Sequence, residues 1–156
     1  MDLIISLDTE DFITPAAREA QLWWAHTLSE YGVRGNFQIV GELLRTYERS
    51  GRTDIIEALR PHEIGYHTDY HSVPPLHPVA LEGVPLDSAV SWVLEREARG
   101  FADLVRLFGR VPVSYCPPGC SWTPATLLAM ASLGVKVWAD ADRFLDAGWY
   151  CGLLGT

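Results

Sequence analysis

The feature that most constrains this chain is the alternation of short apolar runs with longer amphipathic stretches. Apolar runs suited to buried strands occur at residues 3–7, 36–40, 63–66, 113–115 and 135–138. Stretches with helical character lie between or beside them, at residues 15–31, 42–50, 53–59, 87–108 and 124–133. Strands that alternate with helices favour a parallel sheet, in which the loops after successive strands gather at one edge. The sequence therefore predicts an α/β fold with a candidate site at that edge.

The chain length limits how such a sheet can close. The 156 residues suffice for a hydrophobic core, and we expect a single domain over residues 1–156. A closed (β/α) barrel usually needs about 250 residues, with roughly 200 near the minimum. We therefore expect a distorted or incomplete (β/α) barrel, to which a further apolar run at residues 149–153 could add a strand.

Composition argues against several kinds of partner. The net charge of −8 disfavours nucleic acid or an anionic membrane as the main partner. No apolar run approaches the roughly 20 residues of a membrane span, and the first residues do not resemble a signal peptide. The odd number of cysteines, Cys116, Cys120 and Cys151, fits a reducing compartment better than a disulfide framework. These features lead us to expect a cytoplasmic protein.

Acids and imidazoles follow two of the predicted strands. Asp8, Glu10 and Asp11 come after the first strand, and His67 and His71 come after the third. Two imidazoles and a carboxylate form a ligand set that zinc and similar divalent ions accept. On a helical turn, positions four residues apart share a face, so both imidazoles could bind one ion. We expect a divalent ion at this site, with zinc as the first choice. If the ion keeps a coordination position for water, the site would indicate hydrolysis.

A Pro-Pro-Gly turn follows the fourth predicted strand. The backbone amides of Gly119, Cys120 and Ser121 lie near a predicted helix start, where they could stabilise an oxyanion. Trp122 could form an aromatic wall for a sugar ring or pack at the rim of the barrel. The spacing of Cys116 and Cys120 is not a typical zinc spacing, so we interpret both as small apolar side chains.

The order of these motifs resembles the polysaccharide deacetylase family, which is carbohydrate esterase family 4 and is also called the nodulation-factor deacetylase homology domain. The resemblance runs from residue 3 to about residue 142. Its motifs are Asp8-Thr9-Glu10-Asp11, Gly35–Gly41, His62–His71 and Tyr115-Cys116-Pro117-Pro118-Gly119. The segment from residue 62 to residue 71 is the specific one, because an aspartate cluster alone is a weak signal.

The resemblance implies a distorted (β/α) barrel that uses a divalent metal ion to remove N- or O-acetyl groups from sugars. By position, Asp8 resembles the catalytic base of the family, and His67 and His71 resemble its metal-binding histidines. Some members carry the metal carboxylate two residues after the base. On that pattern Glu10 is the third ligand, with Asp11 as the alternative. The expected substrate is an acetylated carbohydrate or another small amide.

Two departures from the family pattern bear on activity. The family has an arginine before the Pro-Pro pair, where it supports the base, and this chain has Cys116 there. The family also has a late histidine that protonates the leaving group, whereas His77 is the last histidine of this sequence. His77 lies in a proline-rich connection and could line the site. Two alternatives therefore stay open: a non-catalytic carbohydrate-binding protein on the same scaffold, and an amidohydrolase acting on a small nitrogen compound.

Overall fold

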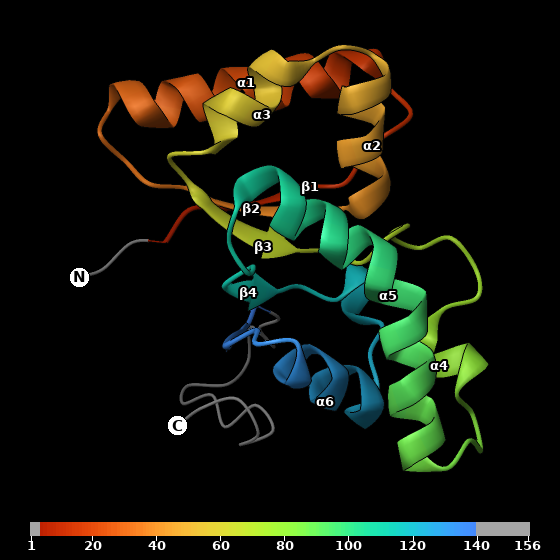
Figure 1. Cartoon of the computed structure of the whole chain (residues 1–156). Coiled ribbons are helices and arrows are strands. Elements are labelled where there is room, and N and C mark those ends of the chain that lie inside the picture. The colour runs from red at the N-terminus through yellow and green to blue at the C-terminus, as the bar shows by residue number, and fades with distance from the viewer. Residues whose placement is uncertain (1–3, 140–156) are drawn as a thin grey trace.

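The computed structural model describes residues 4–139, and within them five parallel strands form one sheet (Figure 1). The strands are β1 (Ser6–Thr9), β2 (Asn36–Ile39), β3 (Glu63–Tyr66), β4 (Ser114–Tyr115) and β5 (Val137–Trp138). Their order in the sheet follows the sequence, and every neighbouring pair is parallel. The predicted α/β architecture with a parallel sheet is confirmed.

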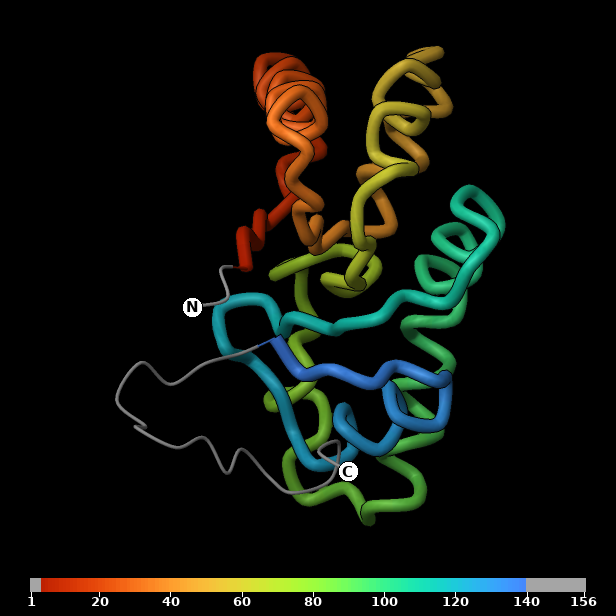
Figure 2. Tube along the Cα trace, turned by 90° about the vertical axis from the view of Figure 1, so that its left-hand side faces the viewer, coloured from red at the N-terminus to blue at the C-terminus, as the bar shows by residue number. Residues whose placement is uncertain are grey.

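Helices connect the strands. They are α1 (Pro15–Glu30), α2 (Gly41–Arg49), α3 (Thr53–Leu59), α4 (His77–Ala80), α5 (Leu86–Phe108) and α6 (Pro124–Ser132), with one 3₁₀ turn, η1 (Pro118–Cys120). The helices α1, α3, α2, α5 and α6 follow one another in an arc beside the sheet (Figure 2), and consecutive members of the arc are in contact. Among the described helices, none is both long enough and apolar enough to span a lipid bilayer.

The sheet is open within the described residues. The two outer strands, β1 and β5, each have one neighbour in residues 4–139. The expected incomplete barrel therefore takes the form of a parallel sheet with an arc of helices along one side (Figure 1). The carboxyl ends of the strands lie at one edge, since all five strands run in the same direction.

The two faces of the sheet differ in polarity. On β2, Phe37 and Ile39 belong to the hydrophobic core. Gln38 points to the opposite face, because side chains alternate along a strand. There its amide donates a hydrogen bond of 2.8 Å to the Ser114 hydroxyl, across the intervening strand β3. Gly65 on β3 leaves room for this bond, because a Cβ at that position would overlap the Gln38 amide.

Several elements differ from the sequence prediction in their bounds, mostly by one or two residues. Strand β1 begins at Ser6 and extends through Thr9, so Asp8 lies within the strand and not after it. The short helix α4 lies in the proline-rich connection, where the sequence showed no periodicity. Helix α1 ends at Glu30, one residue earlier than predicted. The run at residues 149–153, interpreted as a possible strand, lies outside the described residues.

Candidate metal centre and active site

The ends of β1 and β3 bring Glu10, His67 and His71 together. One carboxylate oxygen of Glu10 lies 2.7 Å from His71 Nε2 and 3.1 Å from His67 Nε2. The ligand atoms of all three residues lie within 4.8 Å of one another. His67 is buried, whereas Glu10 and His71 are partly open to solvent. These positions place an N/N/O set of possible metal ligands at the carboxyl edge of the sheet.

The hydrogen bonds of His67 indicate which of its ring nitrogens faces Glu10 as an acceptor. Its Nδ1 lies 2.6 Å from the carbonyl oxygen of Cys116, and a carbonyl oxygen can only accept, so Nδ1 carries a proton. In the neutral ring Nε2 is then an acceptor, and it faces the carboxylate of Glu10, which is also an acceptor. Two acceptors repel each other unless a proton or a cation lies between them. Because metal-ligating histidines usually donate their other N–H to a carbonyl or carboxylate, the donor set fits a divalent ion.

The second imidazole of the set is favoured in its neutral form. Burial lowers the pKa of His71, although the nearby Glu10 carboxylate acts in the opposite direction. The neutral imidazole is the form that binds a metal ion. This direction is therefore compatible with a ligand role for His71.

The chain between the two histidines is a turn and not a helix. Thr68 and His71 have positive φ angles of 66° and 54°, a region that few residues other than glycine adopt. The helical turn considered from the four-residue spacing is therefore wrong. The two rings meet because these residues redirect the backbone, and the ring centroids of His67 and His71 are 4.9 Å apart.

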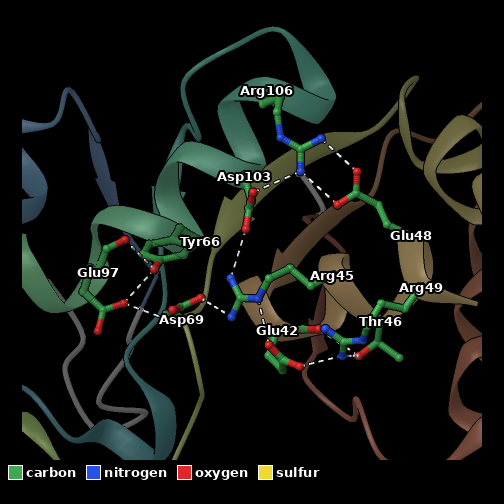
Figure 3. A network of polar contacts seen from close by, with 10 residues as sticks. All are labelled: Glu42, Arg45, Thr46, Glu48, Arg49, Tyr66, Asp69, Glu97, Asp103 and Arg106. Atoms are coloured by element: carbon green, nitrogen blue, oxygen red, sulfur yellow. Dashed lines mark hydrogen bonds and ion pairs between the residues drawn. The ribbon is translucent and has the colours of Figure 1, made fainter.

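Buried charged groups from α2 and α5 hold this turn (Figure 3). The Asp69 carboxylate forms an ion pair of 2.7 Å with Arg45 of α2. The backbone N–H of Asp69 donates a hydrogen bond of 2.7 Å to Glu97 of α5. Glu97 also accepts a hydrogen bond of 2.6 Å from the Tyr66 hydroxyl at the end of β3. All four side chains are buried, so the network fixes the residue between the two histidines from both helices.

Two glycines allow α2 and α5 to approach the turn. The first amides of α2 donate to it, Gly41 N–H to the Thr68 carbonyl at 3.0 Å and Glu42 N–H to the Asp69 carbonyl at 2.8 Å. A Cβ at Gly41 would overlap the Asp69 carboxylate and would lie 2.6 Å from the Cα of Gly100. A Cβ at Gly100 would also overlap Asp69. The turn is therefore enclosed on two sides by helix backbone that carries no side chain, at Gly41 of α2 and at Gly100 of α5.

Asp8 lies on β1 beside His67 and Cys116. A carboxylate oxygen of Asp8, a ring nitrogen of His67 and Sγ of Cys116 lie within 4.8 Å of one another. Asp8 is exposed, so water can reach its carboxylate. The residue assigned as base from the family resemblance therefore lies next to one of the two histidines.

Asp11, the alternative carboxylate ligand, is engaged at the start of α1. Its Oδ1 accepts hydrogen bonds from the backbone amides of Ile13 at 2.9 Å and Thr14 at 2.8 Å. The bond from Thr14, with further hydrogen bonding in the same turn, lowers the pKa of Asp11. The geometry thus brings Glu10 to the histidines and leaves Asp11 at the helix start.

The loop after β4 is closed by its own hydrogen bonds. The amides of Cys120 and Ser121 donate to the carbonyls of Pro117 and Pro118 at 3.3 Å and 2.9 Å. Gly119 and Cys120 both have positive φ angles, 53° and 56°. Two of the three amides considered as oxyanion donors are therefore engaged within the turn, and the Gly119 amide is the remaining candidate.

His77 and Glu97 form a buried pair away from solvent. His77 Nε2 lies 3.0 Å from a Glu97 carboxylate oxygen, and its Nδ1 lies 3.1 Å from the Thr126 hydroxyl. His77 also lines a cavity of about 10 Å³, roughly the space for one water, that reaches His71. Both ring nitrogens of His77 are thus used inside the protein, which does not favour a role as a proton donor to a leaving group.

Two hollows open beside Glu10. One, of about 430 Å³, lies between residues 10–13 and residues 70–73. The other, of about 330 Å³, lies between β1 and α1 and is lined by Trp24. Trp122 lies edge to face against Trp138, with 5.5 Å between ring centroids.

Sequence reasoning missed Arg45 and Glu97. Glu97 carried a signal that could have found it, because it lies in the apolar face of its helix, four residues from both Val93 and Phe101. A charged side chain in such a face must have partners, since burying an unpaired charge is costly. Arg45, next to Leu44 in a short amphipathic helix, carried no comparable signal.

Comparison with known proteins gives matches in structure and none in sequence. No family model matches the chain, and no curated protein matches it significantly. The peptidoglycan deacetylase PdaC from Bacillus subtilis aligns with a TM-score of 0.54 and 18% identity, over 86% of this chain and 55% of that chain. A CE4 family pseudoenzyme from Bacillus anthracis gives a TM-score of 0.58 and 11% identity, over 86% and 41%.

A third structure extends the comparison to an esterase. The family 4 carbohydrate esterase from Streptomyces lividans, in complex with acetate, aligns with a TM-score of 0.55 and 16% identity, over 86% of this chain and 60% of that chain. This chain therefore spans about half the length of the structures that it matches. The chain has the fold of the carbohydrate esterase family 4 structures, as the order of its sequence motifs predicts.

Proposed function

We propose that this chain carries a divalent-metal site of the deacetylase type, which acts on the acetyl group of an acetylated carbohydrate. The observation that carries the proposal is the convergence of Glu10, His67 and His71, in which an acceptor nitrogen of His67 faces an acceptor oxygen. The fold shared with peptidoglycan deacetylase and carbohydrate esterase structures supports the same assignment. Zinc is our first choice of ion, because two imidazoles and a carboxylate suit it.

The roles of the side chains follow from their positions. A divalent ion held by Glu10, His67 and His71 would polarise the acetyl carbonyl and activate water. Asp8, exposed beside His67, would accept the proton of the attacking water. The Cys116 carbonyl would keep Nδ1 of His67 protonated and the ring in position.

The substrate would bind in the hollow of about 430 Å³ that borders Glu10 and His71. The lining of this hollow also includes polar Asp11 and Ser72, the apolar side chains of Phe12, Ile13 and Val73, and the ring of Tyr70. Ligand sites typically pair an apolar lining with a few polar groups, and a sugar ring presents both kinds of surface. The amide of Gly119 is the candidate oxyanion donor in the loop after β4.

Acetate release tests the proposed function, and we expect a weak hydrolase. The family pattern has an arginine where this chain has Cys116, so a fixed cation beside Asp8 is missing. A general acid typically contributes about 10²–10⁴-fold, and both ring nitrogens of His77 are engaged elsewhere. Metal-loaded protein should therefore turn over acetylated sugar oligomers well below the usual range of about 1–10³ s⁻¹. Turnover within that range would contradict this expectation.

A non-catalytic carbohydrate-binding protein is the second candidate, and Cys116 in place of the arginine is the observation that favours it. Binding of sugar oligomers without any acetate release would support this candidate. A parallel panel of small cyclic amides covers the amidohydrolase alternative, which is supported if those compounds are hydrolysed and the sugars are not.

Replacing Asp8 by asparagine is expected to remove the residual hydrolysis and to leave the divalent ion largely bound. Asparagine keeps the shape of the side chain but cannot accept a proton as a base. Acetate release and ion content are measured on the same sample. Asp11→Asn is the matched control, because an amide oxygen at position 11 can still accept the two backbone N–H groups. Unchanged turnover in Asp8→Asn would exclude the base role, and loss of the ion would make Asp8 a ligand.

A further inference from the structure

Cys116 lies at the end of β4 and presents a thiol beside the candidate centre. Its Sγ, a carboxylate oxygen of Asp8 and a ring nitrogen of His67 lie within 4.8 Å of one another. The three residues come from β1, β3 and β4, or directly follow these strands. They form an N/O/S set of donors that shares His67 with the N/N/O set of Glu10, His67 and His71.

The sulfur-containing set is close to the dimensions of a metal site. Zinc is bound at about 2.3 Å by sulfur and about 2.0–2.1 Å by nitrogen, which places neighbouring donors of a tetrahedral ion roughly 3.5 Å apart. The donor atoms lie within 4.8 Å of one another and must move closer to bind an ion, a movement that the exposed side chain of Asp8 allows. His67 cannot move freely, because its Nδ1 is hydrogen-bonded to the Cys116 carbonyl at 2.6 Å. The same residue that offers the thiol therefore holds the ring beside it.

The two donor sets compete for one nitrogen. The bond from Nδ1 to the carbonyl leaves Nε2 as the single free lone pair of a neutral His67 ring. Each set needs His67, and the neutral ring offers one lone pair, so an ion bound with Asp8 and Cys116 cannot share the ring with an ion bound by Glu10 and His71. Zinc accepts sulfur, nitrogen and oxygen ligands and can occupy either set, whereas softer, more thiophilic ions favour the set that contains a thiolate.

We propose that Asp8, His67 and Cys116 form a second, sulfur-containing site for thiophilic divalent ions, which excludes ion binding by Glu10, His67 and His71. On binding, the thiol of Cys116 loses its proton to solvent and the thiolate sulfur forms the bond to the ion. This inference rests on the proposed function, because an ion in the second site occupies Asp8 and so removes the proposed base. A thiophilic ion would then hold the centre in a form that does not hydrolyse acetyl groups.

Cobalt titration tests the proposal without any activity measurement. The parent is the full chain carrying Cys120→Ser and Cys151→Ser, which leaves Cys116 as the single cysteine of three. Co²⁺ added to this parent should give a sulfur-to-cobalt charge-transfer band in the near ultraviolet, together with visible cobalt bands. Adding Cys116→Ser should remove the charge-transfer band. His71→Ala in the parent should keep it, because His71 belongs only to the other set.

Cadmium competition gives the second measurement. Loss even of an outer partner of a metal ligand typically weakens binding about 10–100-fold, so Cys116→Ser should weaken Cd²⁺ binding by at least about tenfold. Cys120→Ser alone should leave Cd²⁺ affinity unchanged. Visible cobalt bands without a charge-transfer band in the parent would overturn the second site while leaving the first intact. Absence of all cobalt bands would overturn the proposed function as well.

Discussion

Replacing His67 and His71 together by alanine is expected to abolish stoichiometric binding of a divalent ion. The two Nε2 atoms lie 3.1 Å and 2.7 Å from the same carboxylate oxygen of Glu10, so the double variant retains one ligand of the three. The variant also removes the nitrogen donor of the proposed sulfur-containing site. Elemental analysis after dialysis should show ion content falling from stoichiometric to background.

A matched control removes a histidine elsewhere in the molecule. His26 is exposed on α1, and His26→Ala should keep the ion content of the parent. Glu10→Gln and Asp11→Asn, compared with each other, identify the carboxylate ligand, and only the first should weaken binding. If the double histidine variant binds as much ion as the parent, the assignment of the metal centre is wrong.

The arrangement of the fold was predictable because its signals are local. Each strand appears in the sequence as a short apolar run, and each long helix as an amphipathic stretch. Once the strands are parallel, their carboxyl ends lie at one edge. This is why residues 10 and 67, distant in the sequence, could be expected to lie close together, and they are in contact in the structure.

The conformation of the turn between the histidines was not predictable from spacing. A separation of four residues fits a helical turn, but Thr68 and His71 adopt positive φ angles instead. Tertiary contacts hold this backbone, through the first amides of α2 and the side chain of Glu97. Such contacts come from residues 27 or 28 positions away and leave no trace in the local pattern.

The exact extent of β1 also depended on tertiary structure. The apolar run ends at Leu7, so the sequence predicts that the strand ends there. Pairing with β2 continues through Thr9 opposite Ile39, which places Asp8 within the strand. The register of the sheet, and not the hydrophobicity of β1, thus sets the position of the proposed base.

Replacing Arg45 by methionine is expected to lower the free energy of unfolding by about 3–5 kcal/mol, the usual cost of removing one partner of a buried ion pair. The Arg45 side chain is buried and forms ion pairs with Glu42, Asp69 and Asp103, at 2.7, 2.7 and 3.0 Å (Figure 3). Burial raises the pKa of Asp69, and Arg45 opposes that effect. Without Arg45 the Asp69 carboxylate must either take up a proton or stay buried and unpaired.

The loss of stability in Arg45→Met should come mainly from Asp69, because Glu42 and Asp103 keep other ion-pair partners. Glu42 retains an ion pair with Arg49, and Asp103 retains one with Arg106. Asp69→Asn in the Arg45→Met background should therefore restore part of the lost stability, since the uncompensated charge is gone. Urea unfolding of both single variants and the double variant gives the coupling energy.

Arg106→Ala is the matched control for Arg45→Met, because it removes an arginine from the exposed end of the same network. The Arg106 side chain is 52% exposed, and exposed ion pairs contribute about 0–1 kcal/mol. Divalent-ion titration provides a second readout, since Asp69 lies between His67 and His71 and its position sets the turn that carries them. Arg45→Met should weaken ion binding, and Arg106→Ala should not. If Arg45→Met is no more destabilising than Arg106→Ala and binds the ion as well, the buried network does not hold the metal-binding turn.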